Sequence, residues 1–88
     1  MPKKDAVERA KELKRKGKSP STQASEFVRE EMRAYEEGKG AKSPSQAVAI
    51  GLSKARRAGV HLPPPKDRPD VRKKAERDLE VGERKGEL

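Results

Sequence analysis

Apolar residues recur at three- and four-residue spacing near the start of the chain, which predicts a first helix over about 6–16. Asp5 and Glu8 form a capping box there, in which each side chain bonds a backbone N–H that the helix start leaves unpaired. The apolar stripe is narrow and consists of Ala6, Ala10 and Leu13. Because so thin a stripe buries little surface, we expect this helix to dock weakly.

A second helix is predicted over about 21–37, with Ser19 or Ser21 as its N-cap. Its apolar positions follow helical spacing and are Ala24, Phe27, Val28, Met32 and Tyr35. Its charged positions lie mostly on the other side and are Glu26, Arg29, Glu30, Arg33 and Glu37. This pattern is typical of a helix that packs on one face. We interpret Phe27 and Tyr35, the two aromatic residues of the chain, as core anchors.

The most completely specified element is a third helix over about 44–58. Ser43 is its N-cap, Gln46 completes a second capping box, and Gly59 provides the stop. Small residues form a stripe along this helix, namely Ala47, Gly51, Ala55 and Ala58. Such a stripe indicates that a neighbouring helix approaches closely.

We place Val48 at the centre of the buried face of the third helix. A glycine inside a helix costs up to about 1 kcal/mol relative to alanine, and close backbone contact at Gly51 would offset that cost. We expect Phe27, Val28 and Tyr35 of the second helix to fill the space above the small-residue stripe.

Three consecutive prolines after Leu62 predict an extended linker over 63–68, because proline cannot continue a helix. A labile fourth helix is predicted over about 69–81, since Val71, Ala75 and Leu79 supply most of its apolar positions. The fold class is therefore a small all-α domain with flexible termini. Its predicted organisation is a basic arm over 1–18, a helical core over 19–62 in the form of a helix-turn-helix-like hairpin, the linker, and a charged, marginally helical tail over 69–88.

Composition narrows the functional classes. Leu, Ile, Val and Phe make up only 13 of 88 residues while 43% are charged, which predicts one small, partially disordered domain. The absence of cysteine excludes disulfides and thiolate metal sites, and His61 has no second ligand nearby. We find no nucleophile with a base, no metal-ligand set and no phosphate-binding loop, so we predict a protein that is not an enzyme, with no cofactor, metal or small-molecule substrate. Without a membrane-length apolar run or a signal-peptide pattern, we expect it to be cytoplasmic, with no membrane partner.

The net charge of +8 is distributed unevenly. Residues 1–18 carry eight Lys and Arg against three acidic residues, and residues 41–66 carry five against none. Between them, residues 19–40 carry three against five. One interpretation is that acidic and basic helices pack together and neutralise each other. The other is that the basic blocks face a polyanion.

The polyanion interpretation predicts a nucleic-acid-binding protein, of DNA or RNA, with salt-sensitive and largely non-specific phosphate contacts. With Val48 inside, the outer side of the third helix presents a stripe that is chemically suited to bases and phosphates. The basic arm, which also contains Lys3 and Lys4, extends the same surface. The candidate residues are Lys11, Lys14, Arg15, Lys16, Lys18, Lys42, Gln46, Ser53, Lys54, Arg56 and Arg57.

Ile50 supports an alternative function, a protein-interaction or homo-oligomeric assembly module. It is a large apolar side chain on the predicted outer side of the third helix, where a solvated helix would carry a polar residue. A homodimer that covers Ile50 would add burial to a thin core. Nucleic acid and a second copy of the chain are thus the two partners that the sequence favours.

Residues 30–60, EEMRAYEEGKGAKSPSQAVAIGLSKARRAGV, resemble a family of small, basic prokaryotic and phage proteins classed as a domain of unknown function. In that family a helix end of the form M-x-x-[FY], with a glycine, leads into a helix of the form S-x-x-Q-A-[IV]-A-I-[AG]-L-S-x-A-R-x-A-G. The matching positions are Met32, Tyr35, Gly38, Ser43, Gln46, Ala47, Val48, Ala49, Ile50, Gly51, Leu52, Ser53, Ala55, Arg56, Ala58 and Gly59. The resemblance implies that residues 43–59 form one unit, and it implies no activity.

Overall fold

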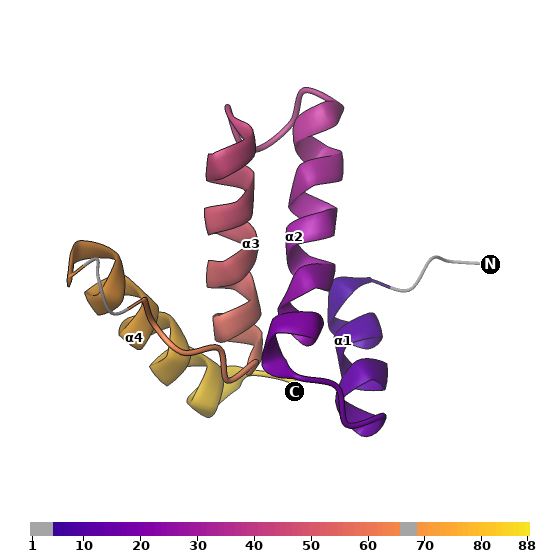
Figure 1. Ribbon diagram of the computed structural model, residues 1–88, viewed down its shortest axis with the longest axis vertical. Helices are drawn as coiled ribbons and strands as arrows, with labels where there is room; N and C mark the ends of the chain where they lie inside the picture. The colour runs from indigo at the N-terminus through magenta and orange to yellow at the C-terminus, as the bar shows by residue number, and fades with distance from the viewer. Residues whose placement is uncertain (1–4, 66–68) are drawn as a thin grey trace.

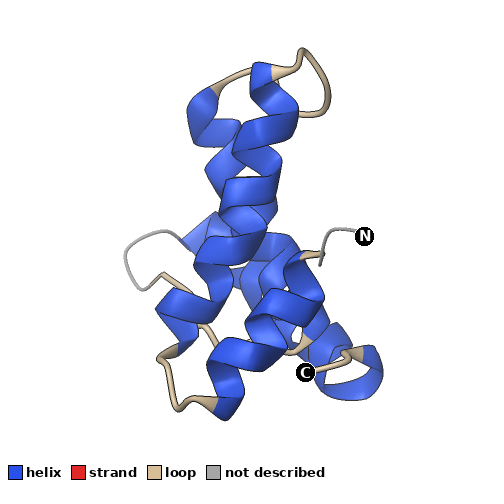
Figure 2. Cartoon of the chain, turned by 90° about the vertical axis from the view of Figure 1, so that its right-hand side faces the viewer, coloured by secondary structure: helices blue, strands red, loops and turns tan. Residues whose placement is uncertain are grey.

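The structure, a computed structural model, describes residues 5–65 and 69–88 as four helices joined by loops (Figures 1 and 2). The helices are α1 (Ala6–Arg15), α2 (Pro20–Glu36), α3 (Pro44–Ala58) and α4 (Pro69–Lys85). The all-α prediction is confirmed. The bounds of the third helix are as predicted, α1 ends one residue earlier, α2 begins and ends one residue earlier, and α4 is four residues longer than expected.

The capping residues explain where the first three helices begin. The Asp5 carboxylate accepts a hydrogen bond from Glu8 N at 2.9 Å, and Ser19 Oγ accepts one from Thr22 N at 3.3 Å. Ser43 Oγ accepts one from Gln46 N at 3.2 Å. Ser19, rather than Ser21, is therefore the cap of α2, and Pro20 occupies the first turn, where its missing N–H costs nothing.

The helices α2 and α3 form an antiparallel hairpin (Figure 1). The two helices approach closely at Gly51, where an added Cβ would lie 2.6 Å from Val28 Cα. The predicted close contact at the small-residue stripe is confirmed, because Gly51 and its neighbours Ala47 and Ala55 are all buried. The prediction that centred the buried face on Val48 is wrong, since that side chain is 38% exposed.

The expected helix-turn-helix-like hairpin is a hairpin, but it lacks the steep crossing of a helix-turn-helix. In a helix-turn-helix the two helices cross steeply, at about 90–120°, and the second lies in the major groove. Here α2 and α3 run side by side along their length (Figure 1). The pair is therefore an αα-hairpin, and α3 is not presented as a recognition helix.

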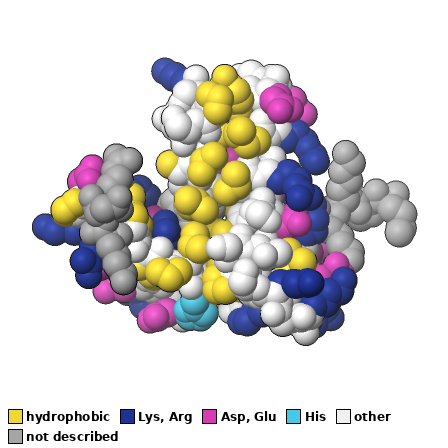
Figure 3. All heavy atoms as spheres, in the orientation of Figure 1, with side chains coloured by type: hydrophobic (Ala, Val, Ile, Leu, Met, Phe, Trp, Pro, Cys, Tyr) yellow, Lys and Arg dark blue, Asp and Glu magenta, His cyan; other side chains and the backbone are white. Residues whose placement is uncertain are grey.

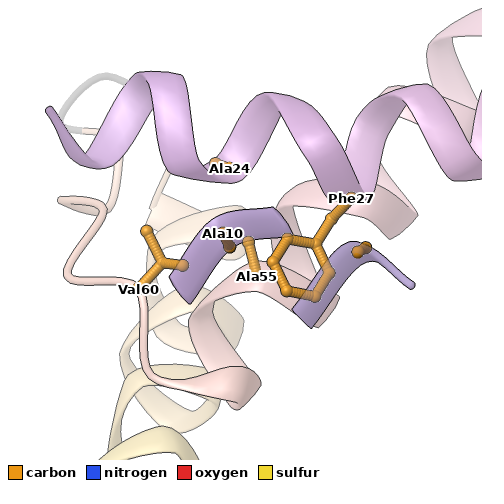
Figure 4. Close-up of a cluster of buried hydrophobic side chains, with 6 residues drawn as sticks. Ala10, Ala24, Phe27, Ala55 and Val60 are labelled. Carbon is orange, nitrogen blue, oxygen red and sulfur yellow. The ribbon is translucent and has the colours of Figure 1, made fainter. Parts of the chain in front are cut away.

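The main core lies where α1, the start of α2 and the end of α3 meet (Figure 4). It consists mostly of alanine, grouped around one aromatic ring, and its buried members are Ala6, Ala10, Ala24, Phe27, Ala55 and Val60. Small side chains let the helix backbones pack closely but bury little apolar surface each. Phe27 is thus the core anchor that was predicted, while Tyr35 is only half-buried.

Ion pairs supplement this thin core. Arg9 Nε lies 2.9 Å from a Glu26 carboxylate oxygen, which ties α1 to α2. Lys54 of α3 pairs with Glu31 of α2. The prediction that placed Glu26 on the outer side of α2 is wrong, because the side chain is buried against α1. Helix α2 therefore forms an ion pair with a basic residue of α1 and another with a basic residue of α3.

The fourth helix packs against the side of α3 opposite α2, near the end of both helices (Figure 1). A Cβ added at Gly82 would lie 2.0 Å from Arg56 O, so only glycine fits at this crossing. Beyond the helix, Leu88 N donates a hydrogen bond of 3.0 Å to Ala58 O, one of the last carbonyls of α3. The segment after residue 81, expected to be a tail, is therefore part of the packed structure.

Candidate nucleic-acid interface

The predicted interface comprised the outer side of α3 and the basic arm, and the structure separates the two. On α3, each candidate side chain has a partner within the chain. Arg56 is the most strongly held and is only 6% exposed. Its Nε donates to Leu62 O at 3.0 Å, and its Nη2 donates to Pro63 O at 3.1 Å.

Arg56 therefore anchors the segment that follows α3. Burial lowers the pKa of its guanidinium, and the negative charge of Asp78 partly offsets that effect. A buried side chain cannot reach a phosphate, so Arg56 is removed from the candidate interface.

Ser53 and Arg57 share one acceptor, the carboxylate of Asp78 on α4. Ser53 Oγ donates to Asp78 Oδ2 at 2.7 Å, and Arg57 Nε donates to Asp78 Oδ1 at 2.9 Å. Lys74 Nζ completes the cluster, at 2.9 Å from Ser53 Oγ and 3.1 Å from Asp78 Oδ2. We refer to Ser53, Arg57, Lys74 and Asp78 as the Asp78 cluster.

Asp78, at the centre of this cluster, is only 2% exposed. Burial by itself raises the pKa of Asp78. The hydrogen bonds from Ser53 and Lys74 and the positive charges of Lys74 and Arg57 outweigh burial, so the pKa lies below its ordinary value. Asp78 is therefore ionised at neutral pH and acts as a fixed counter-ion for α3.

Gln46 and Lys42 have a structural role at the start of α3. Gln46 Oε1 accepts a hydrogen bond of 2.7 Å from Lys42 N, so it bonds the residue before the N-cap and not Ser43 N as the predicted capping box requires. The Lys42 side chain is exposed. Among the candidates in and beside α3, Lys42 and Lys54 therefore keep exposed ammonium groups, the second already paired with Glu31.

The basic arm differs from α3. Its described part ends in five cations at the end of α1 and in the loop that follows, Lys11, Lys14, Arg15, Lys16 and Lys18, which we call the basic segment. All five side chains are exposed. Lys11 Nζ lies 3.7 Å from a Glu87 carboxylate oxygen, and within the described part of the chain no ion pair involves the other four. Figure 3 shows Lys and Arg side chains gathered at the end of the molecule where α1 lies. Lys3 and Lys4 fall outside the described residues.

Ile50 lines a groove between α3 and α4 with a volume of about 600 Å³. Its side chain is half-buried, and Val71 and Ala75 of α4 line the same groove. Ile50, which we interpreted as an apolar residue on an uncovered side of α3, thus lies beside α4 of the same chain.

Three residues that matter for this surface were missed by the sequence analysis, namely Lys74, Asp78 and Gly82. A signal for the last two was present, because Ala75, Asp78 and Gly82 recur at three- and four-residue spacing and mark one face of α4. A charge and a glycine do not count as apolar, so a hydrophobicity pattern passes over them.

Two further observations concern the described part of the chain. It contains no group of three or more His, Cys, Asp or Glu residues placed to bind a metal ion. None of its helices is both long and apolar enough to cross a membrane.

Comparison with known proteins gives one match. No curated protein and no solved structure matches the chain. The model of a family described as a family of unknown function, DUF6496, matches residues 14–66. The match contains α2, α3 and the segment anchored by Arg56, whereas α4 lies outside it. Since more than half of the sequence is matched, the chain belongs to the DUF6496 family of unknown function.

Proposed function

We propose that this protein is a small, non-catalytic nucleic-acid-binding protein that contacts phosphates through its basic segment. The contacts are sequence-independent and salt-sensitive, because lysine and arginine side chains on a helix end neutralise phosphates without reading bases. The net charge of +8 provides the long-range attraction.

One observation carries the proposal. Four of the five cations in the basic segment, Lys14, Arg15, Lys16 and Lys18, are exposed and form no ion pair within the described residues. On α3, by contrast, Lys54, Arg56 and Arg57 all have internal partners. The helix dipole favours cations in the last turn of α1, which accounts for Lys14 and Arg15, but Lys16 and Lys18 lie beyond that turn.

The test is the salt dependence of binding to a fluorescently labelled DNA duplex, measured by anisotropy. The test variant replaces Lys14, Arg15, Lys16 and Lys18 with glutamine. The control variant removes the same charge from exposed cations of α4 that form no ion pair in the described structure, by replacing Lys73, Arg77, Arg84 and Lys85 with glutamine.

Each phosphate contact contributes about −0.9 to the slope of log K against log salt, so we expect the test variant to lose about 2 to 4 units of slope. We expect the control variant to lose much less. Equal losses of slope in both variants would show that only the net charge matters and would contradict a role of the basic segment. The absence of binding by the unmodified protein at low salt would refute the proposal. Circular dichroism of each variant checks that the helices remain folded.

A further inference from the structure

The groove between α3 and α4 is open because the two helices meet at only one end. Close contact occurs where Gly82 lies against Arg56 O and where the Asp78 cluster joins the helices. From there α4 diverges from α3 toward its own first turn (Figure 1). The resulting groove of about 600 Å³ has room for a few large apolar side chains.

The floor of this groove is apolar. From α3 it includes Ala49 and Ile50, and from α4 it includes Val71 and Ala75. Ile50 and Val71 are only half-buried, so apolar surface remains uncovered between the helices. Hydrated phosphate groups would gain nothing from such a floor, whereas aliphatic side chains would.

The closed end of the groove is positively charged. Arg56, Arg57 and Lys74 line it together with the carboxylate of Asp78, and Asp70 lines the groove farther away, in the first turn of α4. The side chains of Arg57 and Lys74 remain 56% and 65% exposed despite their contacts with Asp78. Arg57 donates to Asp78 through Nε, which leaves its two terminal amino groups for another acceptor.

We propose that this groove binds an acidic amphipathic helix of another protein. Apolar side chains on one face of that helix fill the space between Ile50 and Val71, and carboxylates on its flank bind Arg57 and Lys74. This is the helix-in-groove mode of recognition, with charge complementarity at one end. The proposal concerns a different surface from the basic segment and does not depend on the proposed function.

A second copy of the chain fits this site poorly. Each copy carries a net charge of +8, so two positively charged surfaces would meet. The occupant is therefore a chain of opposite charge.

The probe is a labelled synthetic helical peptide with leucine on one face and glutamate on the other, and its twin carries lysine in place of glutamate. Anisotropy with the full chain should show binding of the glutamate peptide at low salt and little binding of the lysine peptide. Amide NMR shifts should then cluster on Ala49, Ile50, Val71 and Ala75. Two outcomes would overturn the proposal. One is equal binding of both peptides, and the other is a cluster of shifts on Val28, Met32 and Val48, apolar residues of α2 and α3 that do not line the groove.

A charge-swap variant makes the test sharper. Ile50→Asp places a carboxylate in the groove, so it should weaken the glutamate peptide by about tenfold or more and strengthen the lysine peptide. Val48→Asp, at an exposed valine on another side of α3, should leave both affinities unchanged. If Ile50→Asp fails to fold, Ala49→Asp, at an exposed position that lines the same groove, replaces it. Equal effects of the groove and Val48 variants on the glutamate peptide would exclude the groove as the binding site.

Discussion

Arg57 Nε donates a hydrogen bond of 2.9 Å to the carboxylate of Asp78, and this contact joins a helix inside the family match to a helix outside it. The same carboxylate accepts hydrogen bonds from Ser53 and Lys74. A residue of α4 thus partly balances the positive charge on the outer side of α3 within the chain.

Replacing Asp78 with asparagine should therefore destabilise the protein. The side chain keeps its size but loses the charge that balances Arg57 and Lys74, and breaking a buried pair costs about 3–5 kcal/mol when both partners are buried. Because Arg57 and Lys74 are more than half exposed, we expect a smaller loss, about 1–3 kcal/mol, in urea unfolding followed by circular dichroism. Glu80→Gln, an equal charge change at an exposed position of α4, is the control and should change stability by less than about 0.5 kcal/mol.

Acid should remove the same contribution. The folded pKa of Asp78 is depressed, so its contribution to stability is fully present above the unfolded value of about 3.9 and is lost as pH falls through the folded pKa. The stability difference between the unmodified protein and Asp78→Asn should therefore be constant between about pH 5 and 7 and should shrink below about pH 4. A difference that stays the same in acid would contradict the role of the carboxylate charge.

Gly82→Ala tests the contact between α4 and α3. Helix propensity alone predicts that alanine stabilises α4 by about 1 kcal/mol. The added Cβ would lie 2.0 Å from Arg56 O, so we expect the opposite sign, a destabilisation of about 1–3 kcal/mol. Hydrogen exchange should show protection lost along α4 and kept in the α2–α3 hairpin, whereas Glu83→Ala, at the neighbouring exposed position, should leave exchange unchanged.

Gly51→Ala tests the hairpin in the same way. Its Cβ would lie 2.6 Å from Val28 Cα, a backbone atom that cannot rotate away. We expect a loss of about 1–3 kcal/mol in thermal or urea unfolding, as for other overpacked sites. Adding Val28→Ala should not rescue the variant, because truncating the side chain leaves the obstructing Cα in place. A rescued double variant would show that the side chain, and not the backbone, sets the helix separation.

The first three helices could be predicted because their ends carry side-chain signals. Asp5, Ser19 and Ser43 each accept a hydrogen bond from a backbone N–H of the helix that follows. These contacts are local, within three residues along the chain, so a sequence contains the information that specifies them. The small-residue stripe of α3 was likewise a local pattern, and its contact with α2 followed from it.

The orientation of α3 was predicted incorrectly for a physical reason. Centring the buried face on Val48 assumed that the largest apolar side chain faces the neighbour. The helices instead approach closely at Gly51, which has no side chain and lies about 60° from Val48 around the helix. Arg56 then turns inward to the carbonyls of Leu62 and Pro63, a contact that depends on the path of the chain after Gly59.

The fourth helix shows a different limit. Its buried positions are Ala75, Asp78 and Gly82, and two of these would be counted as polar or neutral in any hydrophobicity pattern. Their role depends on what faces them, a pair of cationic side chains and a backbone carbonyl. These contacts join residues far apart in the sequence, so the sequence of α3 or of α4 alone does not predict them.

The Asp78 cluster also links two equilibria, the binding of a polyanion to the outer side of α3 and the opening of the contact between α3 and α4. Its carboxylate already accepts from Ser53 Oγ and Arg57 Nε, so a polyanion that used these two donors would compete with a tethered intramolecular ligand. The apparent dissociation constant at that face would equal the intrinsic one divided by the fraction of molecules in which α4 has opened. Any substitution that weakens the contact between α3 and α4 would therefore raise polyanion affinity there, without touching the polyanion itself.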